Sequence, residues 1–156
     1  MVNVIGLGNL LKGDDAVGPT VIELLLGSDN QGELNLVDAG ADAIMVLDYL
    51  LADNPVIIID CAKMGKMAGD VVAFDVNSAN ISHVSTAFSI HGYSFAEIYT
   101  MAVAIGPVAP CRIIGVEPKQ INFNTDLSEE VKASIPKIIN MVKMEAQNYA
   151  QEDIDY

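Results

Sequence analysis

Apolar residues recur along the chain in two spacings, and together they predict alternating strands and helices. Short apolar runs typical of buried strands occupy residues 2–5, 34–37, 56–59, 70–75 and 112–116. Apolar side chains fall at helical spacing over about 16–26 and 42–52, and in a third segment that ends at Gly106-Pro107. Acidic residues after Ser128 open a last helix, which Pro136 is expected to kink or split in two.

One connection decides the topology of the predicted sheet. The segment between the runs at 56–59 and 70–75 is shorter than the dozen or more residues that a parallel crossover requires. The fourth strand is therefore expected to run antiparallel to the others. We find no repeat, low-complexity tract or linker, so residues 1–156 are expected to form a single domain. The predicted fold is a three-layer α/β/α domain with a five-stranded, mostly parallel sheet that contains one antiparallel strand.

Composition and charge narrow the classes of partner. The chain carries 8 basic and 21 acidic residues, a net charge of −13, which disfavours binding to nucleic acid or to an anionic membrane surface. The longest apolar runs are too short to span a bilayer, and no export signal is visible. Two cysteines, Cys61 and Cys111, are too few for a disulfide framework. These features predict a cytoplasmic protein. The negative charge suits cationic partners such as metal ions or a basic peptide segment, but a solubilising surface is the stronger interpretation of it.

A glycine-rich loop follows the first strand and leads into a helix, as in nucleotide-binding proteins. The third glycine of a dinucleotide fingerprint is replaced by Leu11, and a P-loop reading of Gly8 and Gly13 ends in Asp14-Asp15 instead of a lysine. Two carboxylates there would repel a polyphosphate. They suit helix capping or metal binding, and on local sequence alone capping is the stronger reading.

Further acidic residues follow other strands. Asp60 comes directly after the apolar run at 56–59, and Asp38 follows the run at 34–37. Ligands of open α/β sheets bind beyond the carboxyl ends of the strands, where the loop that bears Asp15 also emerges. Carboxylates that meet at this edge would repel one another unless a cation or a partner intervenes.

His91 adds a nitrogen ligand to these carboxylates. It lies three residues before Ser94, which forms a capping box with Glu97, and Gly92 beside it permits an unusual backbone path. Asp15, Asp60 and His91 would form a mixed oxygen and nitrogen set that suits nickel or zinc. Three protein ligands leave positions open for substrate atoms.

Taken together, these residues resemble the hydrogenase maturation protease family, over nearly the whole chain. The matching motifs, in chain order, are Gly6-Leu7-Gly8-Asn9, Gly13-Asp14-Asp15-Ala16-Val17-Gly18, Val56-Ile57-Ile58-Ile59-Asp60, Ser89-Ile90-His91-Gly92, Ile114-Gly115-Val116-Glu117-Pro118 and Leu127-Ser128. The first motif is fairly specific, and the others carry weight in combination.

The resemblance implies a five-stranded mixed sheet and an endopeptidase. Its substrate would be the large-subunit precursor of a nickel-iron hydrogenase, from which it removes a C-terminal extension after nickel insertion. The family's ligand positions map onto Asp15, Asp60 and His91, with nickel carried by the substrate and another divalent metal able to bind in vitro. Some relatives carry glutamate in place of Asp15, so Asp14 is a candidate substitute ligand.

Other hydrolase arrangements fit the sequence less well. A serine or cysteine triad would have to use His83 or His91, nothing marks Cys61 as an activated thiolate, and there is no HExxH helix. Metal-assisted hydrolysis is the favoured mechanism. The alternative function is a metal- or ligand-binding α/β module without catalysis.

Overall fold

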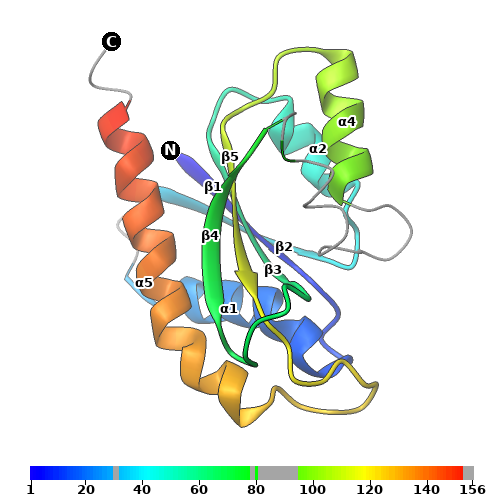
Figure 1. The fold of residues 1–156 in the computed structure, drawn as a ribbon. Coiled ribbons are helices and arrows are strands. Elements are labelled where there is room, and N and C mark those ends of the chain that lie inside the picture. Colours follow the sequence, from blue (N-terminus) through cyan, green and yellow to red (C-terminus); the bar gives the residue numbers. More distant parts are fainter. Residues whose placement is uncertain (30–31, 78–79, 81–94, 153–156) are drawn as a thin grey trace.

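The computed structural model describes residues 1–29, 32–77, 80 and 95–152 of the chain (Figure 1). Strands and helices alternate as the apolar pattern predicts. In chain order the elements are β1 (Val2–Leu7), the 3₁₀ helix η1 (Gly13–Ala16), α1 (Val17–Leu26), β2 (Leu34–Gly40), α2 (Met45–Leu50), β3 (Val56–Cys61), β4 (Val71–Val76), α4 (Phe95–Ile105), β5 (Cys111–Val116) and α5 (Glu129–Glu152).

The five strands form one mixed sheet in the order β2-β1-β3-β5-β4. Strands β2, β1, β3 and β5 are parallel, whereas β4 pairs antiparallel with β5 at the edge. The prediction from the short connection between β3 and β4 is therefore confirmed. The first and third strands lie side by side in register, with Gly6 opposite Ile59, so their carboxyl ends emerge together.

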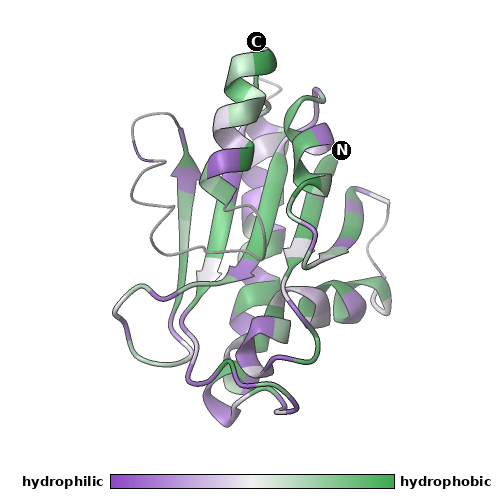
Figure 2. Cartoon of the chain, turned by 90° about the vertical axis from the view of Figure 1, so that its right-hand side faces the viewer, coloured by the Kyte–Doolittle hydropathy of each residue, from purple (hydrophilic) through white to green (hydrophobic). Residues whose placement is uncertain are grey.

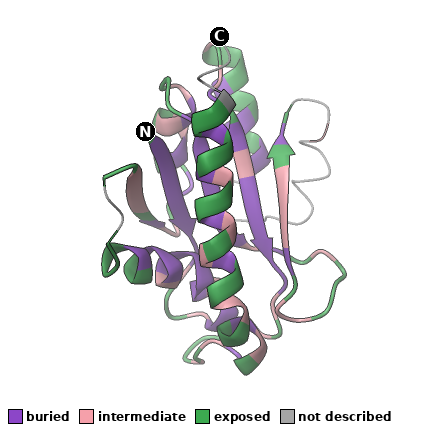
Figure 3. Ribbon diagram, turned by 90° about the vertical axis from the view of Figure 1, so that its left-hand side faces the viewer, coloured by how far each residue is buried: buried purple, intermediate pink, exposed green. Residues whose placement is uncertain are grey.

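Helices cover both faces of the sheet, which confirms the three-layer α/β/α prediction. Ile58 of β3 packs with Val46 of α2 and Ile98 of α4 on one face. Its neighbours Ile57 and Ile59 pack with α1 and α5 on the other. This alternation explains the unbroken apolar run, because a strand covered on both faces has no polar side. Figure 2 shows the apolar sheet between the helices, and Figure 3 shows the exposed outer surface of α5 over buried strands.

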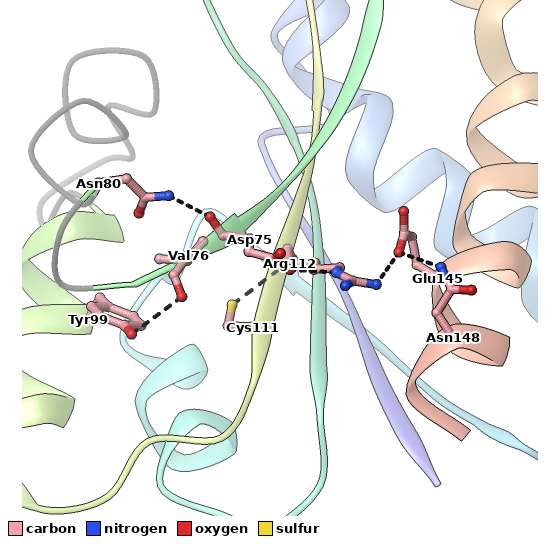
Figure 4. Close-up of polar contacts among 8 residues, drawn as sticks. All are labelled: Asp75, Val76, Asn80, Tyr99, Cys111, Arg112, Glu145 and Asn148. Carbon is pink, nitrogen blue, oxygen red and sulfur yellow. Dashed lines mark hydrogen bonds and ion pairs between the residues drawn. The ribbon is translucent and has the colours of Figure 1, made fainter. Parts of the chain in front are cut away.

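An arginine on β5 joins the edge strand to the last helix. Arg112 Nε donates to Asp75 Oδ1 of β4 at 2.5 Å, and Nη1 of the same guanidinium group donates to Glu145 of α5 (Figure 4). The guanidinium carbon also lies 4.9 Å from the centre of the Tyr149 ring. Because Glu145 is largely shielded from solvent, this tether is stronger than an ordinary surface ion pair.

Several element boundaries differ from the sequence predictions. Helix α2 begins at Met45 rather than near Asp42, because the Asp42 carboxylate accepts the Ile44 amide in a turn that precedes the helix. Strand β3 runs to Cys61, so Asp60 is part of the strand rather than the residue after it. Strand β2 likewise includes Asp38.

Pro136 does not split the last helix. Helix α5 is continuous from Glu129 to Glu152 with Pro136 inside it. A proline in this position leaves the carbonyl of Lys132 without its helical donor. Both residues are exposed, so water can satisfy that carbonyl and the helix persists.

Within the part of the chain that the structure describes, none of the helices combines the length and apolarity needed to cross a lipid bilayer.

Candidate active site

Asp60 lies near the carboxyl end of the central strand β3. It pairs in register with Gly115 of β5 and is only 3% exposed. By strand alternation its side chain points to the same face as Ile58, the face covered by α2 and α4. Its Oδ1 accepts a hydrogen bond from the Cys61 amide at 2.8 Å. The apolar strand therefore presents a carboxylate that is almost fully shielded from water.

Asp15 approaches from the glycine-rich loop between β1 and α1. It lies in η1, is half-buried, and accepts a hydrogen bond from the Asn9 amide at its Oδ2, 2.9 Å away. Gly8 makes this loop geometry possible. Its φ of 137° favours glycine, and a Cβ there would lie 1.8 Å from the Asp15 carbonyl oxygen. Gly8 thus allows the backbone to pack closely beside Asp15.

The two carboxylates interact electrostatically. Burial raises the pKa of Asp60 well above its ordinary value, the negative charge of Asp15 raises this pKa further, and the Cys61 amide opposes the shift. This effect is the one expected if the two carboxylates meet at the edge of the sheet where the parallel strands end. A cation placed near both would relieve the repulsion and favour the ionised form of Asp60.

Asp14 has a different role from its neighbour. It is fully buried, and its carboxylate accepts hydrogen bonds from the amides of Lys119 (2.8 Å), Gln120 (3.1 Å) and Ser128 (2.7 Å) and from Ser128 Oγ (2.9 Å). Ser128 Oγ in turn accepts the Val131 amide in the first turn of α5. Ser128 therefore caps α5, and Asp14 holds this capping residue from 114 positions away instead of capping the helix that directly follows it.

Local capping, by contrast, does not occur at η1 or α1. Neither helix has a side-chain cap, and the residues at their N-cap positions are Lys12 and Ala16. The four donors on the Asp14 carboxylate also bear on its candidacy as a substitute metal ligand, because a ligand role would require it to give up some of them. The sequence did not predict the hydrogen bonds that join Asp14 to the segment before α5. Leu127-Ser128 was part of the family pattern, but no partner had been assigned to it.

Cys61 adjoins the two carboxylates and is half-buried. Burial raises the pKa of its thiol above the ordinary value of 9.0, and the charges of Asp60, Asp15, Asp14 and Glu117 raise it further. A thiol in this environment stays protonated at neutral pH. The structure therefore supports the sequence argument against a cysteine nucleophile.

The remaining candidates contribute less to the described site. Asp38 is exposed, and its Oδ1 accepts the Gly40 amide at 2.9 Å. His91, His83, Ser94 and the rest of residues 81–94 lie outside the described residues, so the third predicted ligand is not placed. Among the described residues, no group of three or more histidine, cysteine, aspartate or glutamate side chains could hold a metal ion.

Comparison with known proteins decides the family. A family model described as hydrogenase maturation protease matches residues 19–145. The chain belongs to the hydrogenase maturation protease family. A relative from Methanocaldococcus jannaschii, named as a hydrogenase maturation protease, is 34% identical over 146 residues, which cover 88% of this chain and 83% of the relative.

Solved structures of family members share the fold. The hydrogenase maturating endopeptidase HybD from E. coli superposes with a TM-score of 0.80 at 20% identity, over 94% of this chain and 92% of that one. The hydrogenase 2 maturation peptidase from a Thaumarchaeota archaeon gives a TM-score of 0.70 at 26% identity, over 95% and 98% of the two chains. The chain is thus a peptidase-family protein with the mixed five-stranded sheet that the resemblance implied.

Proposed function

We propose that this hydrogenase maturation protease removes the C-terminal extension from the large-subunit precursor of a nickel-iron hydrogenase, after nickel has been inserted. Family membership supports the reaction class. The observation that carries the proposal is the buried carboxylate of Asp60 beside that of Asp15, at the edge of the sheet where α/β proteins bind ligands. The protein is expected to act in the cytoplasm.

Nickel would arrive as part of the substrate. Asp60 is shielded from water and experiences the charge of a second carboxylate, so the hydrogen bond from the Cys61 amide compensates its ionised form only in part. A divalent cation held by the precursor would supply that compensation, and oxygen ligands from Asp15 and Asp60 suit such an ion. Because the ionised form of Asp60 would be stabilised by this cation, the site would act on nickel-loaded precursor and not on nickel-free precursor.

His91 is the proposed third ligand. The helix that follows it, α4, begins at Phe95, and Phe95 packs on the same face of the sheet to which Asp60 points. The short segment between His91 and this helix start is compatible with an imidazole near the carboxylates. Another divalent metal could occupy the same ligands in vitro.

Two carboxylates and an imidazole favour metal-assisted hydrolysis over nucleophilic catalysis. A cation near a scissile peptide polarises its carbonyl group and lowers the pKa of a neighbouring water. The contribution of the protein is to hold the two carboxylates in place. The Asn9 amide orients Asp15, and the Cys61 amide orients Asp60.

Mass spectrometry of the precursor tests the proposal. Mixing with the wild-type protein should remove the C-terminal extension from nickel-loaded precursor, whereas Asp60→Ala and His91→Ala should leave its mass unchanged. The matched control is Asp48→Ala, which removes an exposed carboxylate on α2 and should process normally. Binding of the precursor by the wild type without any change in mass would instead identify a non-catalytic binding module.

A further inference from the structure

Three large apolar side chains are exposed together beside the candidate site. Leu10, Leu11 and Phe123 are 58%, 65% and 62% exposed. The first two belong to the loop between β1 and η1, and Phe123 belongs to the loop between β5 and α5. We call these three residues the apolar platform. Apolar side chains that gather at the surface of a soluble protein often mark an interaction site.

Backbone hydrogen bonds hold the two loops of the platform together. The Asn124 amide donates to the Leu11 carbonyl at 2.9 Å, and the Gly13 amide donates to the Thr125 carbonyl at 3.1 Å. Asn124 adopts a φ of 58°, in the left-handed region that asparagine tolerates better than most residues. The Lys12 ammonium lies 5.2 Å from the centre of the Phe123 ring. These contacts order the platform before any partner binds.

The buried carboxylate of Asp14 holds the loop between β5 and α5, which bears Phe123, through hydrogen bonds to its backbone amides. It accepts the amides of Lys119 and Gln120 on one side of Phe123 and that of Ser128 on the other. An ordered apolar surface loses little conformational entropy on binding, which favours affinity. Stability of the isolated domain does not require the platform, because its three side chains remain largely in water.

The platform is continuous with the candidate site. The Leu11 amide donates to the Asn9 side chain at 2.9 Å, and the Asn9 amide donates to the Asp15 carboxylate. Two hydrogen bonds thus join the platform to Asp15. A protein whose peptide binds at Asp15 and Asp60 would therefore lie against Leu10 and Leu11. A second copy of this chain bound to the platform would instead block access to the site.

We infer that the apolar platform docks an apolar surface of the hydrogenase large-subunit precursor next to its scissile segment. This inference rests on the proposed function. The platform supplies affinity for the folded precursor, and the carboxylates supply the response to its metal. Serine in place of one platform side chain therefore weakens binding without changing the chemistry of cleavage.

Steady-state processing of nickel-loaded precursor tests the docking role. Leu11→Ser and Phe123→Ser should each raise KM about tenfold and leave kcat within about twofold of wild type. The matched control is Ile105→Ser. Ile105 is 63% exposed but ends the helix that precedes β5, so it lies at the opposite end of that strand from the loop of Phe123 (Figure 1). It should process with unchanged KM.

Direct binding separates failure of this inference from failure of the proposed function. If the wild type cleaves the precursor and both platform variants keep the wild-type KM, the docking role is wrong and the proposed function stands. If the wild type does not cleave, precursor affinity measured by calorimetry still tests the platform, and equal affinity of wild type and Leu11→Ser overturns it. A wild-type dimer that Phe123→Ser dissociates would show that a second copy occupies the platform, which also overturns it.

Discussion

Asp14 and Asp60 are both buried carboxylates, yet their contacts predict opposite effects on stability. Asp14 accepts four hydrogen bonds from two segments that lie more than a hundred positions away in the sequence. Replacement by alanine removes all four acceptors. We therefore expect Asp14→Ala to destabilise the fold strongly, by releasing the start of α5 and the loop before it.

The loss of unfolding free energy in Asp14→Ala depends on which of the four hydrogen-bond donors to Asp14 can be hydrated instead. Lys119 is exposed and Gln120 half-buried, so their amides can be hydrated after the substitution at small cost. Ser128 is buried, and its amide and hydroxyl would each lose a bond to a charged acceptor, worth about 1.5–3 kcal/mol. The expected loss is about 4 kcal/mol, a large fraction of the roughly 5–15 kcal/mol that stabilises a typical domain.

Thermal and urea unfolding measure this loss directly. At this chain length, about 4 kcal/mol corresponds to a decrease in Tm of roughly 8–16 °C. Asp14→Asn keeps one acceptor oxygen and should lose about half as much free energy of unfolding. The control is Asp48→Ala, which removes an exposed carboxylate. A free energy of unfolding for Asp14→Ala within about 1 kcal/mol of wild type would show that Asp14 does not hold the start of α5 in place.

Four further substitutions follow from the same structure. Asp60→Asn should raise Tm at neutral pH and abolish processing. The pKa of Asp60 is raised in the folded state, so ionisation of this carboxyl group destabilises the fold once the pH rises above its pKa in the unfolded chain, about 3.9. In a series of Tm measurements, the stabilisation by asparagine should therefore vanish below that pH. Gly18→Ala should cost at least about 3 kcal/mol in urea unfolding, since its Cβ would lie 2.3 and 2.6 Å from carbonyl oxygens of β1 and β3. Gly27→Ala, with no atom closer than 3.6 Å, should stabilise by about 0.5 kcal/mol. Arg112→Met should lower the free energy of unfolding by about 1–2 kcal/mol by leaving Glu145 partly buried without its cation, and calorimetry should show unchanged precursor affinity.

The sheet and the position of Asp60 could be predicted because their signals are local. An unbroken apolar run identifies a strand covered on both faces, and a short connection excludes a parallel crossover. The first polar residue after such a run lies at the carboxyl edge whether the strand ends at Ile59 or Cys61. Small errors in the strand boundary therefore did not affect the placement of Asp60.

The separate roles of Asp14 and Asp15 could not be predicted from the sequence. Both follow the same glycine and precede the same helix, so local propensity treats them alike. In η1 the carboxylate of Asp15 accepts the Asn9 amide and its charge acts on Asp60, whereas the carboxylate of Asp14 accepts the amides of a distant loop. That choice depends on tertiary contacts at Lys119, Gln120 and Ser128, which no local pattern encodes.

Pro136 and Asp42 show two further limits of local rules. A proline inside a helix costs about 3 kcal/mol relative to alanine even where the turn is exposed, yet α5 continues through Pro136 because the buried side chains of Val131 and Ile138 hold the helix against the sheet on either side. Asp42 was predicted to begin a helix, but its side chain bonds to the Ile44 amide and forms a turn instead.

We propose that this family member recognises nickel seated in its substrate through Asp15, Asp60 and His91. The most direct measurement compares the processing of nickel-loaded and nickel-free precursor by the purified protein, with the mass of the precursor as readout. We predict loss of the C-terminal extension from the nickel-loaded form alone, and from neither form with Asp60→Ala. Equal processing of both forms by the wild type, or full activity of Asp60→Ala, would contradict the claim.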